Sequence, residues 1–265
     1  MIVRYGPQDA QRWATFSGDF NPIHFDLAAA HHIGLPSRAV HGMRAMLDLK
    51  QHISKTYLQH TEENAPSLHF SARLKAPLYE SHDYHLTSDN RQPQRIRSVI
   101  RDAESTVNSI EATLRPAPLP HYAISSPEQT FDPGAREAAF NDATADSSEK
   151  LAGWLLPDAS LFCCILEAPQ TMQVVNDVLP DLGARCLAEV FPVLPMVQTH
   201  HDVYFSSTLL SPQSAGAMPL RWHVIPTILM GNRNEGFIFR MGAQGSLSHR
   251  EHITVLITLK TWPLL

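Results

Sequence analysis

The sequence has little cysteine and no long apolar run. Its 265 residues include three cysteines, Cys163, Cys164 and Cys186, an odd number without the spacing of metal ligands. Buried free thiols in a reducing compartment fit this best, so we expect a cytoplasmic protein. No eighteen consecutive apolar residues occur, so a membrane span is not predicted. The first residues lack the apolar core of a secretory signal, and we expect none.

An excess of basic residues is also lacking. The formal net charge is −5, with 21 Lys and Arg against 26 Asp and Glu. This balance gives no general electrostatic reason to expect a nucleic acid partner. Hydrophobic residues make up 43% and charged residues 18%, as in an ordinary globular protein. The length suits one large domain or two small ones.

The most informative stretch is a signature turn, which we define as residues 17–26 and which reads S-G-D-F-N-P-I-H-F-D. Pro22 fixes its own φ and pushes Asn21 out of the helical region, so the stretch is a turn and not helix interior. Asp19 and His24 are therefore presented five residues apart from one tight bend. A carboxylate and an imidazole so placed could share a single water.

A second motif, His41-Gly42-Met43, follows seventeen residues after His24 and opens a long segment of helical periodicity. The first N–H groups of a helix have no partner within the helix. They can therefore stabilise a developing oxyanion. Together the two motifs indicate chemistry on an activated carbonyl.

These motifs resemble those of the MaoC-like, or (R)-specific enoyl-CoA hydratase, family of hotdog-fold proteins. The family pattern is roughly S-G-D-x-N-P-[IL]-H-x-D, followed after a short helix by [IV]-x-H-G-M, and residues 40–43 read V-H-G-M. The resemblance covers about the first hundred residues and hardly extends into the second half.

The resemblance implies an activity and a role for each motif residue. The family adds water to a 2-enoyl thioester to give a (3R)-hydroxyacyl thioester, or removes it, without a cofactor or a metal. Asp19 would be the general base, with His24 as its partner on one water. Gly42 would supply the oxyanion hole, and the supporting residues would be Ser17, Asn21 and His41. The substrate would be carried by CoA or by an acyl-carrier protein.

Several motif residues also have purely structural interpretations. Asn21 either orients the catalytic pair or suits a turn before proline. Gly42 either admits a thioester close to the backbone or serves helix packing, and His41 could support the bend. Asp26 is interpreted as a helix N-cap.

The predicted central helix suggests alternative activities and contains one departure from the family pattern. Asp48 resembles the helix carboxylate of some hotdog thioesterases, which leaves an acyl thioesterase as an alternative activity. A non-catalytic acyl-thioester binding protein is the other alternative. Lys50 stands where the hydratases often carry a serine.

The periodicity predicts one helix followed by antiparallel strands in the first half. Apolar residues recur at helical spacing in 41–52, and the period changes to two in 68–76. Three more strands are predicted at 82–87, 95–101 and 106–115. A sheet wrapped around a central helix is an α+β hotdog, by pattern as well as by resemblance.

The second half shows the same order of elements. Residues 161–194 are mostly helical in pattern, and strands are predicted at 203–210, 220–230, 236–241 and 252–262. We therefore expect a double hotdog, with a motif-bearing hotdog at 1–118, a linker at 119–135 and a degenerate hotdog at 136–265. Three prolines within 116–120 favour the linker. Such a chain could be a pseudo-dimeric monomer or could form a homodimer.

An internal repeat with an offset of 135 residues is suggested by the similarity of 203–212 to 68–77. The same offset places Trp154 on Asp19 and Ala159 on His24. It also places Asn176-Asp177 on His41-Gly42. On this alignment the second half has lost the catalytic residues by substitution, and one active site per chain is expected.

Two groups of basic side chains have both a bland and a functional interpretation. The pairs His31-His32 and His200-His201 lack a matching set of ligands, so no metal site is predicted. Arginines gather at positions 91, 95, 97, 101 and 115. They form either a solvated sheet face or a landing site for the phosphates of CoA or for an acidic carrier protein.

Overall fold

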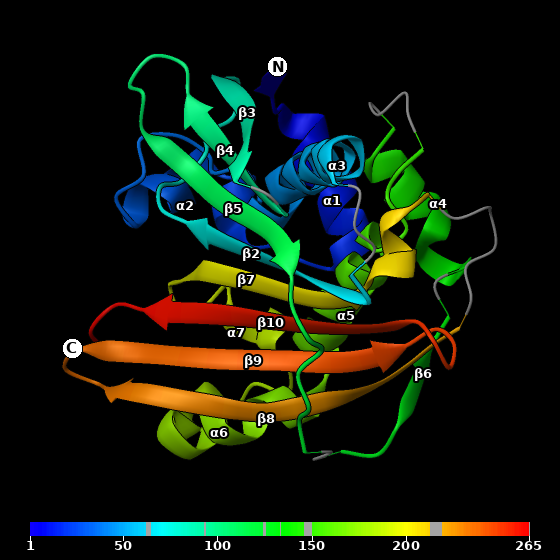
Figure 1. Cartoon of the computed structure of the whole chain (residues 1–265). Helices are drawn as coiled ribbons and strands as arrows, with labels where there is room; N and C mark the ends of the chain where they lie inside the picture. The colour runs from blue at the N-terminus through cyan, green and yellow to red at the C-terminus, as the bar shows by residue number, and fades with distance from the viewer. Residues whose placement is uncertain are drawn as a thin grey trace.

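A single antiparallel sheet runs through the whole molecule, with the principal helices packed against one of its faces (Figure 1). The computed structural model describes residues 1–61, 65–92, 94–123, 126–132, 134–145, 150–212 and 219–264. Within these residues ten strands follow the order β1-β3-β4-β5-β2-β7-β10-β9-β8-β6. None of the described helices combines the length and apolar character needed to cross a membrane.

The first half is built around one long helix. Its elements are β1 (Ile2–Arg4), α1 (Pro7–Ser17), the 3₁₀ helix η1 (Pro22–His24), α2 (Leu27–His32), α3 (Gly42–His60), β2 (Ser67–Leu74), β3 (Asp83–Gln92), β4 (Arg95–Asp102) and β5 (Asn108–Pro116). Helix α3 packs against β3, β4 and β5 and also contacts α1 and α5. Because it is enclosed from several sides, its apolar stripe is broad, and Met43, Met46 and Ile53 are almost fully buried.

The second half repeats this plan around a shorter and more apolar helix. Its elements are β6 (Gln129–Phe131), α4 (Gly134–Ala143), α5 (Leu155–Glu167), η2 (Pro169–Met172), α6 (Gln173–Val178), η3 (Pro180–Leu182), α7 (Leu187–Val190), β7 (Met196–Ser206), η4 (Ser207–Leu210), β8 (Leu220–Asn232), β9 (Gly236–Ser246) and β10 (His252–Thr261). Helix α5 packs on β8, β9 and β10 and also contacts α1 and α7. Eleven of its residues are buried, which explains why it is apolar on nearly all sides.

The two halves are related by the order of their strands. Reading the sheet from either end gives equivalent elements, β1 with β6, β3 with β8, β4 with β9, β5 with β10, and β2 with β7 at the centre. At this central seam Leu68 pairs with Phe205 and Phe70 pairs with Val203. An offset of 135 converts each of these pairs into the other, as an approximate two-fold axis requires. The predicted double hotdog is confirmed.

Three predicted strands are wrong in their limits. Strands β3 and β9 extend beyond the predicted intervals 82–87 and 236–241, and the third error is larger. The interval 203–210 was expected to be a strand, but β7 covers Met196–Ser206 and the chain then forms η4. The start of β7 escaped the pattern because Thr199 and His200 are polar. The apolar pair Leu209 and Leu210 is buried from a 3₁₀ turn and not from a strand.

The predicted counterpart of the signature turn is also wrong. Trp154 is the N-cap of α5 and Ala159 lies inside it, so this segment is equivalent to the start of α3. Asn176 and Asp177 lie in α6. The offset fails because residues 168–195 separate α5 from β7, whereas only 61–66 separate α3 from β2.

The second half instead has a shortened connection where the signature turn would be. Residues 18–41 separate α1 from α3, but only 144–154 separate the equivalent helices α4 and α5. The first of these connections contains η1 and α2. The second half has therefore lost room for the turn, which is a change of length and not only of residue type.

The division at 119–135 stays a prediction. Strand β6 lies inside this interval and pairs with β8, and residues 124, 125 and 133 of it lie outside the described residues. After β5 the chain crosses the outer face of the second half (Figure 1), where Gln244 Nε2 donates to Pro120 O at 3.4 Å.

Candidate active site

The signature turn begins where α1 ends. Gly18 caps the helix with φ 77°, and its N–H donates to Ala14 O at 2.8 Å. Only glycine adopts this left-handed conformation at little cost, and it turns the chain sharply after Ser17. The N–H of Asp19 then donates to the buried Ser17 Oγ at 3.1 Å, so Ser17 holds the backbone of the proposed base.

Asn21 organises the turn through both its backbone and its side chain. Its N–H donates to Asp19 Oδ1 at 3.2 Å, and its own Oδ1 accepts from the N–H of Ile23 at 3.4 Å. The second contact caps η1, which Pro22 starts. Asn21 therefore supports the turn through its side chain and the Asp19 carboxylate through its backbone.

His24 has one ring nitrogen committed to the protein. Nδ1 lies 2.8 Å from Ala39 O, and because a carbonyl can only accept, Nδ1 carries the hydrogen. In the neutral ring Nε2 therefore presents a lone pair. This contact selects the tautomer in which the outer nitrogen can bind or take a proton.

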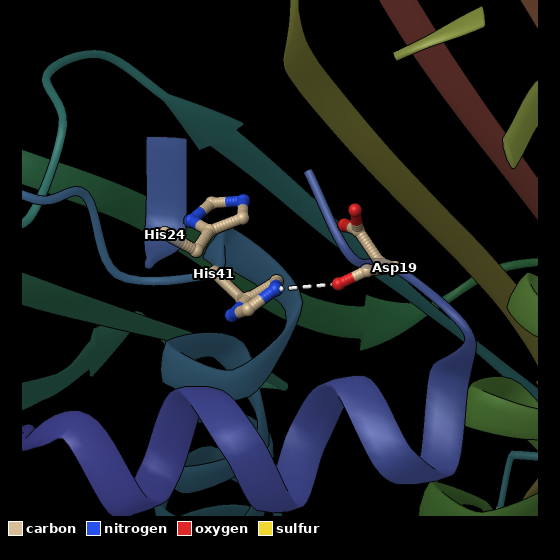
Figure 2. Close-up of side chains that lie close together, drawn as sticks. All are labelled: Asp19, His24 and His41. Carbon is tan, nitrogen blue, oxygen red and sulfur yellow. Dashed lines mark hydrogen bonds between the residues drawn. The ribbon is translucent and has the colours of Figure 1, made fainter. Parts of the chain in front are cut away.

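His41 lies beneath His24 and anchors the turn to α3. The two rings stack with their centroids 3.6 Å apart at an interplanar angle of 25°. His41 Nε2–H donates to the backbone carbonyl of Asp19 at 3.0 Å. Figure 2 shows the carboxylate of Asp19 and the ring of His24 above the ring of His41. His41 is only 2% exposed, and its ring contacts both His24 and the backbone of Asp19. It therefore supports the pair from below.

Burial moves the pKa values of the pair toward one another. It raises the pKa of Asp19 above the usual 3.8, against the opposing charge of His24 and the N–H of Asn21. It lowers the pKa of His24 below 6.5, against the attraction of Asp19. Burial and the neighbouring His24 hold the pKa of His41 well below 6.5. An acid and a base of similar pKa exchange a proton with little loss of free energy.

The raised pKa of Asp19 has a consequence for stability. The folded chain holds this proton more tightly than the unfolded chain does, so ionisation disfavours folding as pH rises from about 3.8 through the folded pKa. Asp19→Asn is therefore expected to raise Tm at pH 7, and the gain should shrink as pH falls toward 4. Thermal unfolding between pH 4 and 7 measures this. A gain that is absent, or that grows at low pH, would contradict it.

Asp26→Asn is the matched control for that experiment. Asp26 accepts from the N–H of Ala28 at 2.8 Å, and thus is the N-cap of α2 that the sequence predicted. Asparagine caps helices about as well as aspartate, so this variant should change Tm little at pH 7.

Gly42 is the first residue of α3 and is packed closely by β2. A Cβ at this position would lie 2.5 Å from Leu74 Cδ2. Packing thus favours glycine here, although Leu74 could move its terminal methyl, and the approach of a thioester to the Gly42 N–H stays a prediction. The first N–H groups of α3 have no partner within the helix, and His41 is the N-cap residue directly before them.

Gly42→Ala is expected to destabilise the protein by about 0.5–1.5 kcal/mol, because Leu74 must turn its terminal methyl away from the added Cβ. Leu74→Ala removes the obstructing atoms, so adding Gly42→Ala to that variant should cost far less. Denaturant unfolding of the two single variants and the double variant measures the coupling. Equal costs in both backgrounds would show that the contact with Leu74 is not the cause.

Asp48 is engaged elsewhere. Its Oδ2 lies 3.0 Å from Arg44 Nη1, and Arg44 is also 2.9 Å from Asp9. Arg44 is nearly buried, so both carboxylates neutralise a charge that has left water. Asp48 thus belongs to an ion-pair network and not to the group around Asp19.

One group of three residues has the composition of a metal site. Among the described residues, potential ligand atoms of Asp19, His24 and His41 all lie within 4.8 Å of one another. His24 Nδ1 and His41 Nε2, however, donate to backbone carbonyls. Binding of one ion by all three would be limited to the remaining nitrogens, on rings that already stack face to face.

A buried polar cluster was missed from the sequence. We define the interhelical cluster as Lys50, Asp158 and His201, whose side chains are all fully buried. Lys50 Nζ lies 2.5 Å from Asp158 Oδ2, and His201 Nε2 lies 2.8 Å from Asp158 Oδ1. The cluster joins α3 to α5 and β7. His201, one of the adjacent histidines, thus has a structural partner.

Comparisons with known proteins support the resemblance. Residues 3–59 match the family model described as a MaoC like domain. No curated protein matches the chain. A solved structure titled MaoC-like dehydratase is 10% identical with a TM-score of 0.52, covering 98% of this chain and 95% of that one.

Two further solved structures are similar over most of the chain. A putative MaoC domain protein dehydratase from Chloroflexus aurantiacus is 10% identical with a TM-score of 0.48, covering 100% of this chain and 93% of that one. A tesB protein from Mycobacterium avium subs. paratuberculosis is 9% identical with a TM-score of 0.47, covering 85% of this chain and 88% of that one. At these identities the likeness concerns the fold alone, and only the structure with a TM-score above 0.5 bears on it.

Proposed function

We propose that this chain is a hydro-lyase, because residues 3–59 match the MaoC like family model and the chain folds as a double hotdog. It interconverts 2-enoyl thioesters and (3R)-hydroxyacyl thioesters. One observation carries the proposal. The bond from His24 Nδ1–H to Ala39 O leaves the Nε2 lone pair free, and this ring stands with the Asp19 carboxylate above His41 (Figure 2).

In the hydration direction the pair activates one water. The water donates a hydrogen bond to His24 Nε2, which orients it, and Asp19 takes the other proton of the water. The water oxygen then forms a bond to C3 of the enoyl group. The π electrons move toward the thioester oxygen, and the pair returns one proton to C2. Dehydration follows the same steps in reverse, with loss of the C3 hydroxyl as water.

The enolate that forms on the way needs hydrogen-bond donors. The N–H of Gly42, at the positive end of α3, is the donor we propose. Ser17, Asn21 and His41 support the pair through the contacts described above. No cofactor takes part in this scheme. The acyl group would be presented by CoA or by an acyl-carrier protein in the cytoplasm, at one site per chain.

Crotonyl-CoA and longer 2-enoyl-CoAs test the proposal. The hydro-lyase should remove the absorbance of the conjugated thioester without releasing free thiol. Release of thiol would support the thioesterase alternative. Binding with neither change would support a non-catalytic acyl-thioester protein. Chiral analysis of the product should give the (3R)-hydroxyacyl thioester, and the (3S) product would contradict the proposed geometry.

A further inference from the structure

A groove lies on the outer face of the first half, away from the proposed active site. It has a volume of about 700 Å³ and extends over β2, β3, β4 and β5. Leu74 contacts Gly42 on the helix-covered face of β2. Arg73, the preceding residue, points to the opposite face because side chains alternate along a strand, and it lines the groove.

The lining of the groove is rich in guanidinium groups. Its lining includes Ser71 and Thr113, which pair across β2 and β5, and Arg97 pairs with Thr113 from β4. The Ser71 hydroxyl is hydrogen-bonded to the carboxylate of Asp202, whereas Thr113 has its hydroxyl on the groove. The side chains of Arg73, Arg91, Arg95 and Arg97 line it as well. Three of these four belong to the arginine group seen in the sequence. Arg101 and Arg115 do not line the groove.

Two carboxylates in the lining neutralise two of the four arginines. Asp89 forms an ion pair with Arg91, whose hydrogen bonds lower the pKa of Asp89 to about 2. Glu111 lies 3.1 Å from Arg97 and 2.8 Å from Lys75. Mainly through Lys75, these partners lower the pKa of Glu111 to about 2. Both acids are thus ionised and occupied at neutral pH.

Two positive charges in the groove are left over. Arg73 has no carboxylate within ion-pair distance among the residues that the structure describes. Among the same described residues, the hydrogen-bond partner of the Arg95 guanidinium is the neutral side-chain amide of Gln92, at 3.4 Å. Solvated arginines would need no further account, but these two share a concave surface with Thr113 and two paired arginines.

That arrangement suits a particular class of ligand. Guanidinium groups bind phosphate oxygens through two parallel hydrogen bonds, and serine and threonine hydroxyls can donate to the same oxygens. A singly charged anion gains little at an exposed site, because water and salt screen it. A ligand with two linked phosphates can engage both excess charges at once.

We propose that this groove binds the linked phosphates of a small molecule through Arg73 and Arg95, with Thr113 as a hydroxyl donor. The site lies on the opposite face of the sheet from Asp19. The binding test is therefore independent of whether the chain has the proposed hydro-lyase activity. Arg91 and Arg97 supply additional positive potential from their ion pairs.

Calorimetry with pyrophosphate, ADP and orthophosphate tests the site on the full chain. We expect saturable binding of pyrophosphate and ADP with one site per chain, at least about tenfold tighter than that of orthophosphate. Arg73→Gln and Arg95→Gln should each weaken pyrophosphate binding about tenfold, and the double variant should abolish it. Tighter binding of ADP than of pyrophosphate would identify a nucleotide as the source of the phosphates, and equal binding would identify the phosphates alone.

Arg221→Gln is the matched control, because Arg221 is an exposed arginine on β8 in the other half of the sheet. It removes the same charge and should leave binding unchanged. All the substituted arginines are exposed, and equal Tm values would verify that folding is intact. The proposal would be overturned if neither pyrophosphate nor ADP gave saturable binding. It would also be overturned if Arg221→Gln weakened pyrophosphate binding as much as Arg73→Gln and Arg95→Gln do.

Discussion

Asp19→Asn and His24→Ala are each expected to lower kcat/KM for 2-enoyl thioester hydration by about 10³-fold or more. Proton transfer by a positioned side chain contributes about 10²–10⁴-fold, and both residues act on the same water. Because they act as one unit, the double variant should be little worse than either single variant. Loss of enoyl absorbance under limiting substrate measures all three.

Matched controls come from the same segment of the chain. Asp26→Asn and His32→Ala change an aspartate and a histidine of the neighbouring helix α2, where Asp26 only caps the helix and His32 is exposed. Both should retain nearly full activity. Substantial activity in Asp19→Asn and in His24→Ala would exclude this pair as the catalytic groups, even if the wild-type protein is a hydro-lyase.

Asp158→Asn is expected to destabilise the protein by about 3–5 kcal/mol, because it leaves the buried ammonium of Lys50 without its counter-charge. Lys50 Nζ also lies 5.6 Å from the ring of Phe70 and 5.8 Å from that of Trp154. These contacts are weaker than the lost ion pair. Denaturant unfolding followed by tryptophan fluorescence gives the change in the free energy of unfolding.

The tautomer of His201 explains why Asp158 is the critical member. Gln198 Nε2 lies 3.2 Å from His201 Nδ1, and an amide N–H donates there, so the ring hydrogen is on Nε2. In this tautomer the 3.2 Å contact between Lys50 Nζ and His201 Nε2 is not a hydrogen bond, because both groups are donors. Nε2–H then donates to Asp158 Oδ1. Burial by itself would raise the pKa of Asp158, but Lys50 and His201 hold it below 3.8. One carboxylate thus satisfies both neighbours.

A variant that removes both charges separates the ion pair from simple packing. Lys50→Met combined with Asp158→Leu leaves no buried charge and should cost less than Asp158→Asn alone. As a surface control, Glu189→Gln breaks the exposed pair with Arg185 and should change stability by less than about 1 kcal/mol. A double variant that is less stable than Asp158→Asn would contradict the account of an uncompensated charge.

Local features were predictable from the sequence because their causes are local. Pro22, Gly18 and Asp26 each act on the backbone within a few residues, so the turn and the N-cap of α2 follow from the order of residues. The fold of each half follows from the change of hydrophobic period between 41–52 and 68–76.

Distant partners were not predictable in the same way. Lys50 meets Asp158 across 108 residues, and nothing near Lys50 in the chain marks it as buried. Likewise, the repeat was recognised from its central strands, where the pairing preserves the register. The connections changed length in opposite directions on either side of α5, and a constant offset cannot follow two such changes.

The seam between β2 and β7 bears on what either half could do by itself. Separation would turn β2, now in the middle of the sheet, into an edge with unpaired N–H and C=O groups along Ser67–Arg73. It would also leave the ammonium of Lys50 without a carboxylate. A fragment that ends near residue 118 should therefore associate with itself or aggregate, so the two halves, although similar in architecture, depend on each other.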